Sequence, residues 1–141
     1  ADLGIRLGGF ARGELNAITD VPGVRIGHTT ITAPGLNTGV TAIVPDALGP
    51  DRRMLPAGLC VGNGYGKLIG VSQLGELGAI ETPILLTSTL AAFRVADALV
   101  SHMIALPGYE QTTTLNPVVG ETNDGFLSDI RARRITEDDV L

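Results

Sequence analysis

Three glycines at alternate positions, Gly62, Gly64 and Gly66, follow directly on an apolar run at residues 57–61. The run predicts a buried strand that breaks into a tight loop. Glycine has no Cβ atom, so such a loop can adopt positive φ and bring its backbone close to a ligand or to another strand. We expect this glycine corner, residues 62–66, to shape the fold around it.

The composition indicates a globular segment and argues against two classes of partner. The 141 residues are 44% apolar, which is enough for one unit with a real core. The net charge of −5 and the pI near 4.8 provide no basic surface for nucleic acid or for anionic membranes. We therefore expect neither partner.

The single cysteine and the first residues of the chain give information about the cellular compartment. Cys60 cannot form an internal disulfide, and its apolar surroundings predict a buried thiol. A reducing, cytoplasmic compartment is favoured. No run approaches the roughly 18 apolar residues of a membrane span. The start at Ala1 has no signal segment, although a removed signal would leave no trace, so a periplasmic or secreted location stays open.

The first half of the chain predicts strands. Residues 24–31 alternate apolar and polar side chains, and residues 39–44 are rich in β-branched residues, so a hairpin with a loop at 33–38 is expected. Residues 46–56 predict a loop, 68–77 a short helix weakened by its glycines, and 84–87 an extended segment. Glu76 and Glu81 are expected in solvent.

The strongest periodic pattern predicts a helix at residues 90–106. Seven apolar residues recur there at spacings of three and four: Leu90, Phe93, Ala96, Leu99, Val100, Met103 and Ile104. The hydroxyl side chains of residues 87–89 are candidate N-caps, and Pro107 ends the helix. Arg94 and Asp97 can form a surface pair.

A polar cluster of Glu121, Asn123 and Asp124 follows a short extended run at residues 116–120. It could form a pocket wall in which a carboxylate receives a cationic amine and an amide orients a carbonyl. It could equally be a turn closed by Asx-type hydrogen bonds, which the pattern alone favours. The interpretation as a binding site therefore needs support from elsewhere in the chain.

The last residues resemble a helix start, with Thr136 as N-cap and acidic residues at 137–139. A helix that stops at Leu141 after one turn is not stable alone. We expect another segment or chain to continue it.

Common enzyme motifs do not match the sequence. It has no Gly-x-Ser-x-Gly, Cys-x-x-Cys or His-Glu-x-x-His, and its serines have no base nearby in sequence. His28 and His102 are far apart, so no metal site is expected. His28 is interpreted as a strand-end residue and His102 as an exposed helical one. Phosphate or nucleotide binding at Gly62–Lys67 remains a weaker alternative, because the spacing is not that of a P-loop.

Five stretches together resemble a known family: Asn-Ala-Ile-Thr-Asp-Val-Pro-Gly-Val-Arg-Ile-Gly-His at 16–28, Thr-Gly-Val-Thr-Ala-Ile at 38–43, the Gly-Asn-Gly-x-Gly corner, Glu-Thr-Pro-Ile-Leu-Leu-Thr at 81–87, and Val-Val-Gly-Glu-Thr-Asn-Asp-Gly at 118–125. In this order they resemble the DmpA-type L-aminopeptidase/D-esterase and β-aminopeptidase enzymes, serine peptidase family S58. The resemblance covers essentially the whole chain.

The resemblance implies an α/β fold, an αββα sandwich of the Ntn-hydrolase type, of which residues 1–141 would be a single segment from the N-terminal part of the α chain. It implies a precursor that cleaves itself, and a nucleophilic Ser or Thr at the new N-terminus of a partner segment outside this chain. Oligomers of heterodimers would then act on short peptides, amides or esters, without a cofactor. A non-catalytic binding or assembly subunit of the same fold is the alternative.

The resemblance also implies two substrate-binding residues. The family glutamate that holds the substrate's amino group matches Glu121, and the pocket position two residues on matches Asn123. No catalytic residue is expected within the chain itself. A partly desolvated carboxylate suits a terminal ammonium, because the hydrogen bond between them is charge-assisted.

Overall fold

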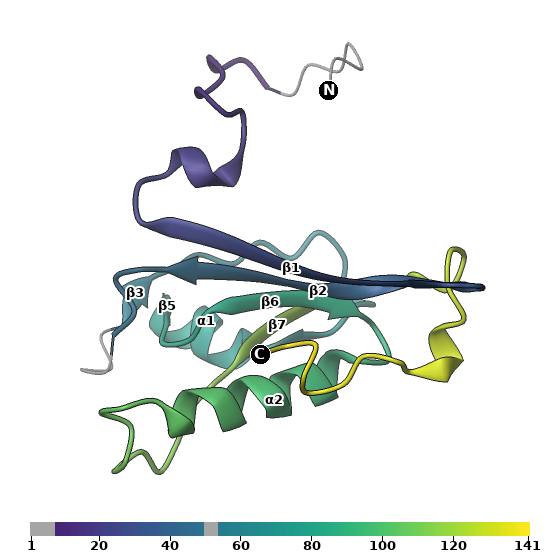
Figure 1. Ribbon diagram of the computed structural model, residues 1–141. Coiled ribbons are helices and arrows are strands. Elements are labelled where there is room, and N and C mark those ends of the chain that lie inside the picture. Colours follow the sequence, from purple (N-terminus) through teal and green to yellow (C-terminus); the bar gives the residue numbers. More distant parts are fainter. Residues whose placement is uncertain (1–7, 50–53) are drawn as a thin grey trace.

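The computed structural model describes residues 8–49 and 54–141, and Figure 1 shows their arrangement. In chain order the elements are η1 (Ile18–Asp20), β1 (Val24–Ala33), β2 (Leu36–Pro45), β3 (Leu55–Pro56), β4 (Leu68–Ile69), α1 (Val71–Leu77), β5 (Ala79–Ile80), β6 (Ile84–Ser88), α2 (Ala92–Ala105), β7 (Val118–Thr122) and η2 (Ile130–Ala132). The predicted α/β class is confirmed.

The first two strands form the predicted hairpin. β1 and β2 pair antiparallel from Val24 opposite Pro45 to Ala33 opposite Leu36, so both strands are longer than the pattern indicated. The loop is correspondingly shorter, with Gly35 at a φ of 74° in the turn. The predicted loop at 46–56 is irregular in its described residues 46–49 and 54, its end forms β3, and residues 50–53 lie outside the described part.

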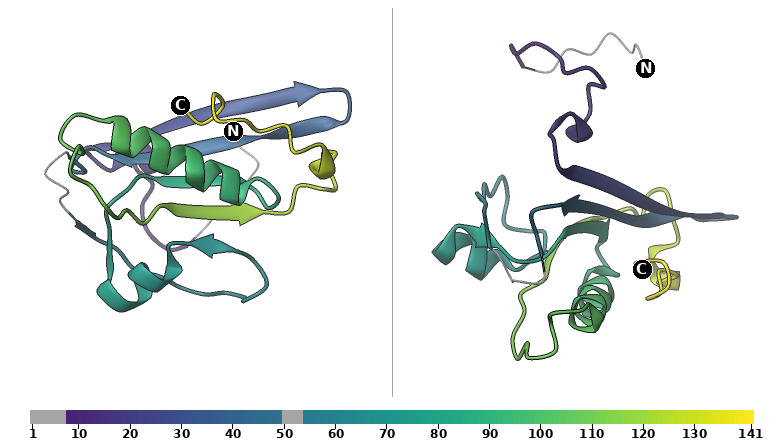
Figure 2. Two further views of the ribbon diagram at one scale, coloured as in Figure 1. Left: turned by 90° about the horizontal axis from the view of Figure 1, so that it is seen from below. Right: turned by 60° about the vertical axis from the view of Figure 1, so that its left-hand side comes forward.

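A five-stranded mixed sheet in the order β1-β2-β6-β7-β4 organises the described residues. β6 and β7 are parallel, and α2 connects them across one face of the sheet (Figure 2). Parallel neighbours need such a crossover, because a tight turn can join only antiparallel strands. The extended segments predicted at 84–87 and 116–120 correspond to β6 and β7.

The two faces of the sheet carry different apolar clusters. Leu85 and Val119 are paired across β6 and β7 and pack with α2. Their neighbours Ile84 and Val118 point to the opposite face and pack with Leu74 of α1. This second cluster covers only the β4 and β7 side of that face, together with the small sheet of β3 and β5.

The predicted helix exists, but it turns a different face to the sheet. The buried residues of α2 are Ala92, Val95, Ala96, Ala98, Leu99 and Met103. The predicted core positions Phe93, Ile104 and Leu90 are instead 67%, 50% and 42% exposed. Small side chains let the helix approach the sheet closely, and the apolar residues outside that stripe face outward.

Arg94 does not form the predicted surface pair with Asp97. Its guanidinium donates to the backbone carbonyls of Arg133 and Ile135 at 2.8 and 2.7 Å. Ile135 is 1% exposed and belongs to the cluster under α2. Arg94 therefore anchors the C-terminal segment across the helix. That segment ends in a turn, where Thr136 donates its N–H to Asp139 at 2.7 Å, rather than in a helix.

The expectations for the glycine corner are partly wrong. Residues 57–61 form no strand, and Cys60 is exposed rather than buried. None of the three glycines of the corner has a positive φ. A left-handed glycine does follow the corner: Gly70, at φ 87°, separates β4 from α1 and so shortens the helix predicted at 68–77. Among residues 8–49 and 54–141, no helix is long and apolar enough to span a membrane.

Candidate functional site

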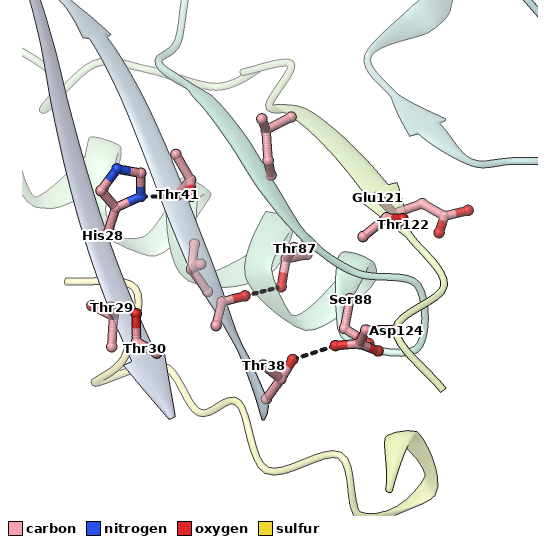
Figure 3. Close-up of a pocket in the computed structure, with 13 residues that line it drawn as sticks. His28, Thr29, Thr30, Thr38, Thr41, Thr87, Ser88, Glu121, Thr122 and Asp124 are labelled. Atoms are coloured by element: carbon pink, nitrogen blue, oxygen red, sulfur yellow. Dashed lines mark hydrogen bonds between the residues drawn. The ribbon is translucent and has the colours of Figure 1, made fainter. Parts of the chain in front are cut away.

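A pocket of about 440 Å³ lies over the main sheet (Figure 3). Strands β1, β2, β6 and β7 and the residues just after β7 line it: His28, Thr29, Thr30, Thr38, Gly39, Val40, Thr41, Leu86, Thr87, Ser88, Glu121, Thr122 and Asp124. Seven of these thirteen residues carry a hydroxyl group, and Glu121 and Asp124 carry carboxylates.

His28 belongs to this pocket, which its sequence position did not indicate. It lies within β1 rather than at a strand end, opposite Thr41 of β2. Its Nδ1 and the Thr41 Oγ1 are hydrogen-bonded at 2.9 Å. His102 is exposed on α2, as predicted. No group of three or more metal-ligating side chains occurs in the part of the chain that the structure describes.

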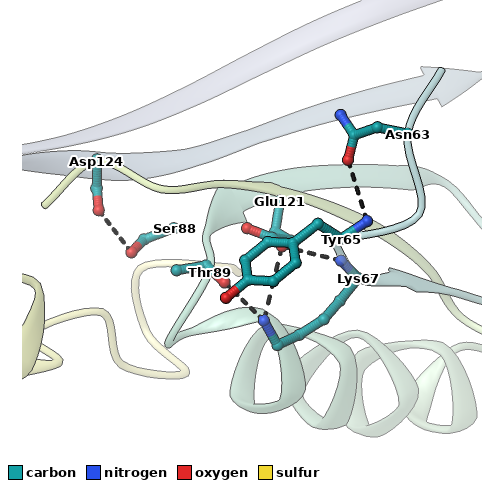
Figure 4. A network of polar contacts seen from close by, with 7 residues as sticks. All are labelled: Asn63, Tyr65, Lys67, Ser88, Thr89, Glu121 and Asp124. Atoms are coloured by element: carbon teal, nitrogen blue, oxygen red, sulfur yellow. Dashed lines mark hydrogen bonds and ion pairs between the residues drawn. The ribbon is translucent and has the colours of Figure 1, made fainter.

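Glu121 meets Lys67 because of strand register. β4 and β7 are antiparallel, with Leu68 opposite Gly120, so the next pair along the ladder is Lys67 and Glu121. The Lys67 backbone N–H donates to Glu121 Oε1 at 2.9 Å, and the Lys67 ammonium lies 3.7 Å from the same oxygen (Figure 4). The ammonium donates to Thr89 Oγ1 at 2.8 Å.

These contacts keep the Glu121 carboxylate ionised. Its side chain is 6% exposed, and this desolvation acts to raise its pKa. The Lys67 backbone N–H, the Thr89 hydroxyl and the Lys67 charge together outweigh burial, so the pKa of Glu121 lies below its usual value of 4.5. A buried, charged carboxylate therefore borders the pocket.

The second carboxylate, Asp124, has uncharged partners. Thr38 of β2 donates to its Oδ2 at 2.6 Å and Ser88 of β6 donates to its Oδ1 at 2.8 Å. Its backbone carbonyl accepts the N–H groups of Leu127 and Ser128. Asp124 thus ties the loop after β7 to two strands of the sheet.

Asn123 does not line the pocket. It is exposed, and its side-chain oxygen accepts the backbone N–H of Gly125 at 3.0 Å. This is the Asx-type turn that the sequence pattern favoured. The structure thus brings Glu121, but not Asn123, to the pocket.

The hydroxyls of residues 87–89 were predicted as caps of α2, yet the helix is capped by Ala91 without a side-chain bond. Thr87 donates to the Gly39 carbonyl at 3.0 Å, Ser88 donates to Asp124, and Thr89 accepts from the Lys67 ammonium. Glu81, expected in solvent, is 7% exposed and accepts from the backbone and side chain of Asn116. The hydroxyl groups of residues 87–89 thus make three long-range contacts in place of the predicted helix cap.

The glycine corner places a carboxylate where a phosphate would have to bind. The Lys67 backbone N–H, which could serve a phosphate, already donates to Glu121. The corner also leads into β4, and α1 begins only at Val71, so no helix N-terminus adjoins it. This arrangement disfavours the phosphate alternative, because two anions would repel each other.

Comparison with known proteins agrees with this architecture. The chain matches the model of peptidase family S58 over residues 16–141. It is 34% identical over 151 aligned residues to the beta-peptidyl aminopeptidase BapA of Sphingosinicella microcystinivorans, covering 99% of this chain and 37% of the relative. The chain thus spans little more than a third of that relative's length.

Two solved structures are similar over 99% of the chain. A beta-aminopeptidase of Burkholderia sp. shares 39% identity with a TM-score of 0.83, and the match covers 40% of it. The L-aminopeptidase D-Ala-esterase/amidase of Ochrobactrum anthropi, described as a new variant among the Ntn hydrolase fold, shares 35% identity with a TM-score of 0.83, and 41% of it is covered. The fold and the sequence together show that the chain belongs to peptidase family S58.

Proposed function

We propose that this chain is the N-terminal segment of an S58-type aminopeptidase and that Glu121 receives the free amine of the substrate. The observation that carries the proposal is the buried, ionised Glu121 carboxylate at the edge of the pocket. The relatives named aminopeptidases agree with an activity of this class.

The chemistry follows from what an aminopeptidase must recognise. A terminal ammonium on Glu121 fixes one end of the substrate and so orients the adjoining acyl carbonyl. The nucleophile is a Ser or Thr hydroxyl outside this chain, at an N-terminus released when the precursor cleaves itself. Its oxygen attacks the carbonyl, its proton passes to the free α-amine, and the leaving amine takes a proton as the acyl bond breaks. Water then releases the acyl group.

The partners follow from the same proposal. A complementary segment or β chain carries the nucleophile, and heterodimers of the two assemble into an oligomer. Esters are further substrates, because the same attack on an acyl carbonyl releases an alcohol. The hydroxyl-rich pocket over the sheet offers the surface on which the reacting group can approach Glu121.

The test is Glu121→Gln in the complete protein. This change keeps the shape and removes the charge, so we expect kcat/KM for a free-amine peptide to fall about 10- to 100-fold. Hydrolysis of the N-acetylated peptide, which has no ammonium for Glu121 to bind, should not change. Glu110→Gln is the matched control, since Glu110 is exposed beyond α2 and outside the pocket. Equal loss for both peptides, or no loss, would refute the role.

Two further measurements address the alternatives. Intact-mass analysis should find a second polypeptide that begins with Ser or Thr. If none is present, the chain is part of a non-catalytic binding or assembly subunit of this fold. A nucleotide site at Gly62–Lys67 would instead be revealed by thermal stabilisation with ATP, which we do not expect.

A further inference from the structure

Lys67 stands at the point where the proposed substrate amine would bind. Its ammonium lies 3.7 Å from Glu121 Oε1, a separation that allows attraction but is too long for a hydrogen bond. The close hydrogen bond of the ammonium goes to Thr89 Oγ1, at 2.8 Å. The cation is therefore only loosely coupled to the Glu121 carboxylate (Figure 4).

The Lys67 side chain is not needed to position Glu121. The firm contact to Oε1 comes from the Lys67 backbone N–H at 2.9 Å, and this bond depends on the pairing of β4 with β7 rather than on the side chain. What the ammonium adds is charge. It balances the carboxylate and contributes to the low pKa of Glu121.

The two side chains differ in their freedom to move. Glu121 is 6% exposed, whereas Lys67 is 40% exposed and can reach water. A substrate ammonium that approaches Glu121 meets a neutral pair rather than a bare carboxylate. Two like charges a few ångströms apart repel each other, so the substrate must displace the lysine or bind beside it.

We infer that Lys67 sets the affinity of the amine site, as a resident cation that competes with the substrate's ammonium for Glu121. The inference rests on the proposed function of Glu121. The competition lowers affinity for every amine at this site. A simple amine, which has no other contacts, is therefore bound weakly, and a substrate binds well only through additional contacts of its own.

The experiment measures the inhibition constant of n-butylamine, a simple amine, against a free-amine peptide in the complete protein. Lys67→Met removes the charge and keeps the backbone bond to Glu121. We expect the inhibition constant to fall about tenfold, as relief of a like-charge contact predicts. Lys67→Arg keeps the cation and should bind n-butylamine like the unchanged protein. Lys67→Gln is a second neutral variant in case the methionine variant does not fold.

The outcomes separate this inference from the proposed function. A tighter inhibition constant in either neutral variant, with no change for Lys67→Arg, supports competition. An unchanged or weaker inhibition constant, while Glu121→Gln still loses free-amine hydrolysis, overturns the role of Lys67 and leaves that of Glu121 intact. If Glu121→Gln has no effect on free-amine peptides, the proposed function fails, and this inference fails with it.

Discussion

Two carboxylates at the end of β7 differ in the partners that surround them. Glu121 faces a cation and a backbone N–H from Lys67, whereas Asp124, three residues later, accepts two neutral hydroxyl groups from Thr38 and Ser88. Both residues border the same pocket. Proximity to a pocket therefore does not by itself identify the residue that binds substrate.

The partners also differ in how easily they can be replaced. Ser88 is 7% exposed, and its hydroxyl is held by a short side chain on a central strand. Lys67 reaches its partner through a long, flexible side chain that is 40% exposed. Fixed neutral donors suit a structural tie, while an exchangeable cation suits a site that must receive another cation.

The largest difference in stability is expected from Asp124→Ala. Loss of this carboxylate leaves two hydroxyl groups near the sheet without their acceptor and removes one of the ties that hold the loop after β7, which also bonds Asn37 and Gly35 of the hairpin. We expect the free energy of unfolding of the complete protein to fall by about 2 kcal/mol. Chemical denaturation measures it. Glu121→Gln, which keeps the acceptor for the Lys67 N–H, should cost less than half as much; equal losses would contradict the distinction between the two carboxylates.

A smaller effect is expected from Ser88→Ala, which removes one of the two donors to Asp124. The loss should be about 1 kcal/mol, because the other donor, Thr38, remains. Ser72→Ala is the matched control on the exposed surface of α1 and should lie within about 0.5 kcal/mol of the unchanged protein. A loss for Ser88→Ala no larger than this control would show that Asp124 is not a structural tie.

The sequence predicted those parts of the fold that local periodicity encodes. The hairpin, β6, β7 and α2 follow from alternation, turn glycines and helical spacing. Even so, the face of α2 was only partly predicted, because its apolar residues extend beyond one stripe. Which of them are buried depends on how closely the helix can approach the sheet, as Phe93 and Ala92 illustrate.

The candidate site was harder to predict from the sequence than the fold. Pattern alone favoured a turn for residues 121–125 over a pocket wall, and the family resemblance was needed to select Glu121 as the binding residue. Its contact with Lys67 joins residues that are 54 positions apart in the sequence. The contact depends on the pairing of β7 with β4, a strand of only two residues that no sequence pattern indicated. The hydroxyls of residues 87–89 fit a local rule for helix caps equally well. No local pattern distinguishes a cap from a long-range donor.

The smallest expected effect is a change in stability at acidic pH, which distinguishes the contribution of the Glu121 charge from that of its shape. Because the folded-state pKa of Glu121 is lowered, its ionised form contributes stability that is fully present above the usual pKa of 4.5 and is lost as pH falls through the lower folded-state value. Glu121→Gln removes this contribution at all pH values. The difference in unfolding free energy between the two proteins should therefore shrink as pH falls below about 4.5. We expect less than about 1 kcal/mol, since the partly exposed Lys67 is screened by water. Denaturation at a series of pH values measures the difference. If the difference in unfolding free energy stayed constant across the acid range, the negative charge of Glu121 would contribute nothing to stability. Its shape and its hydrogen bond would then account for its whole contribution to the fold.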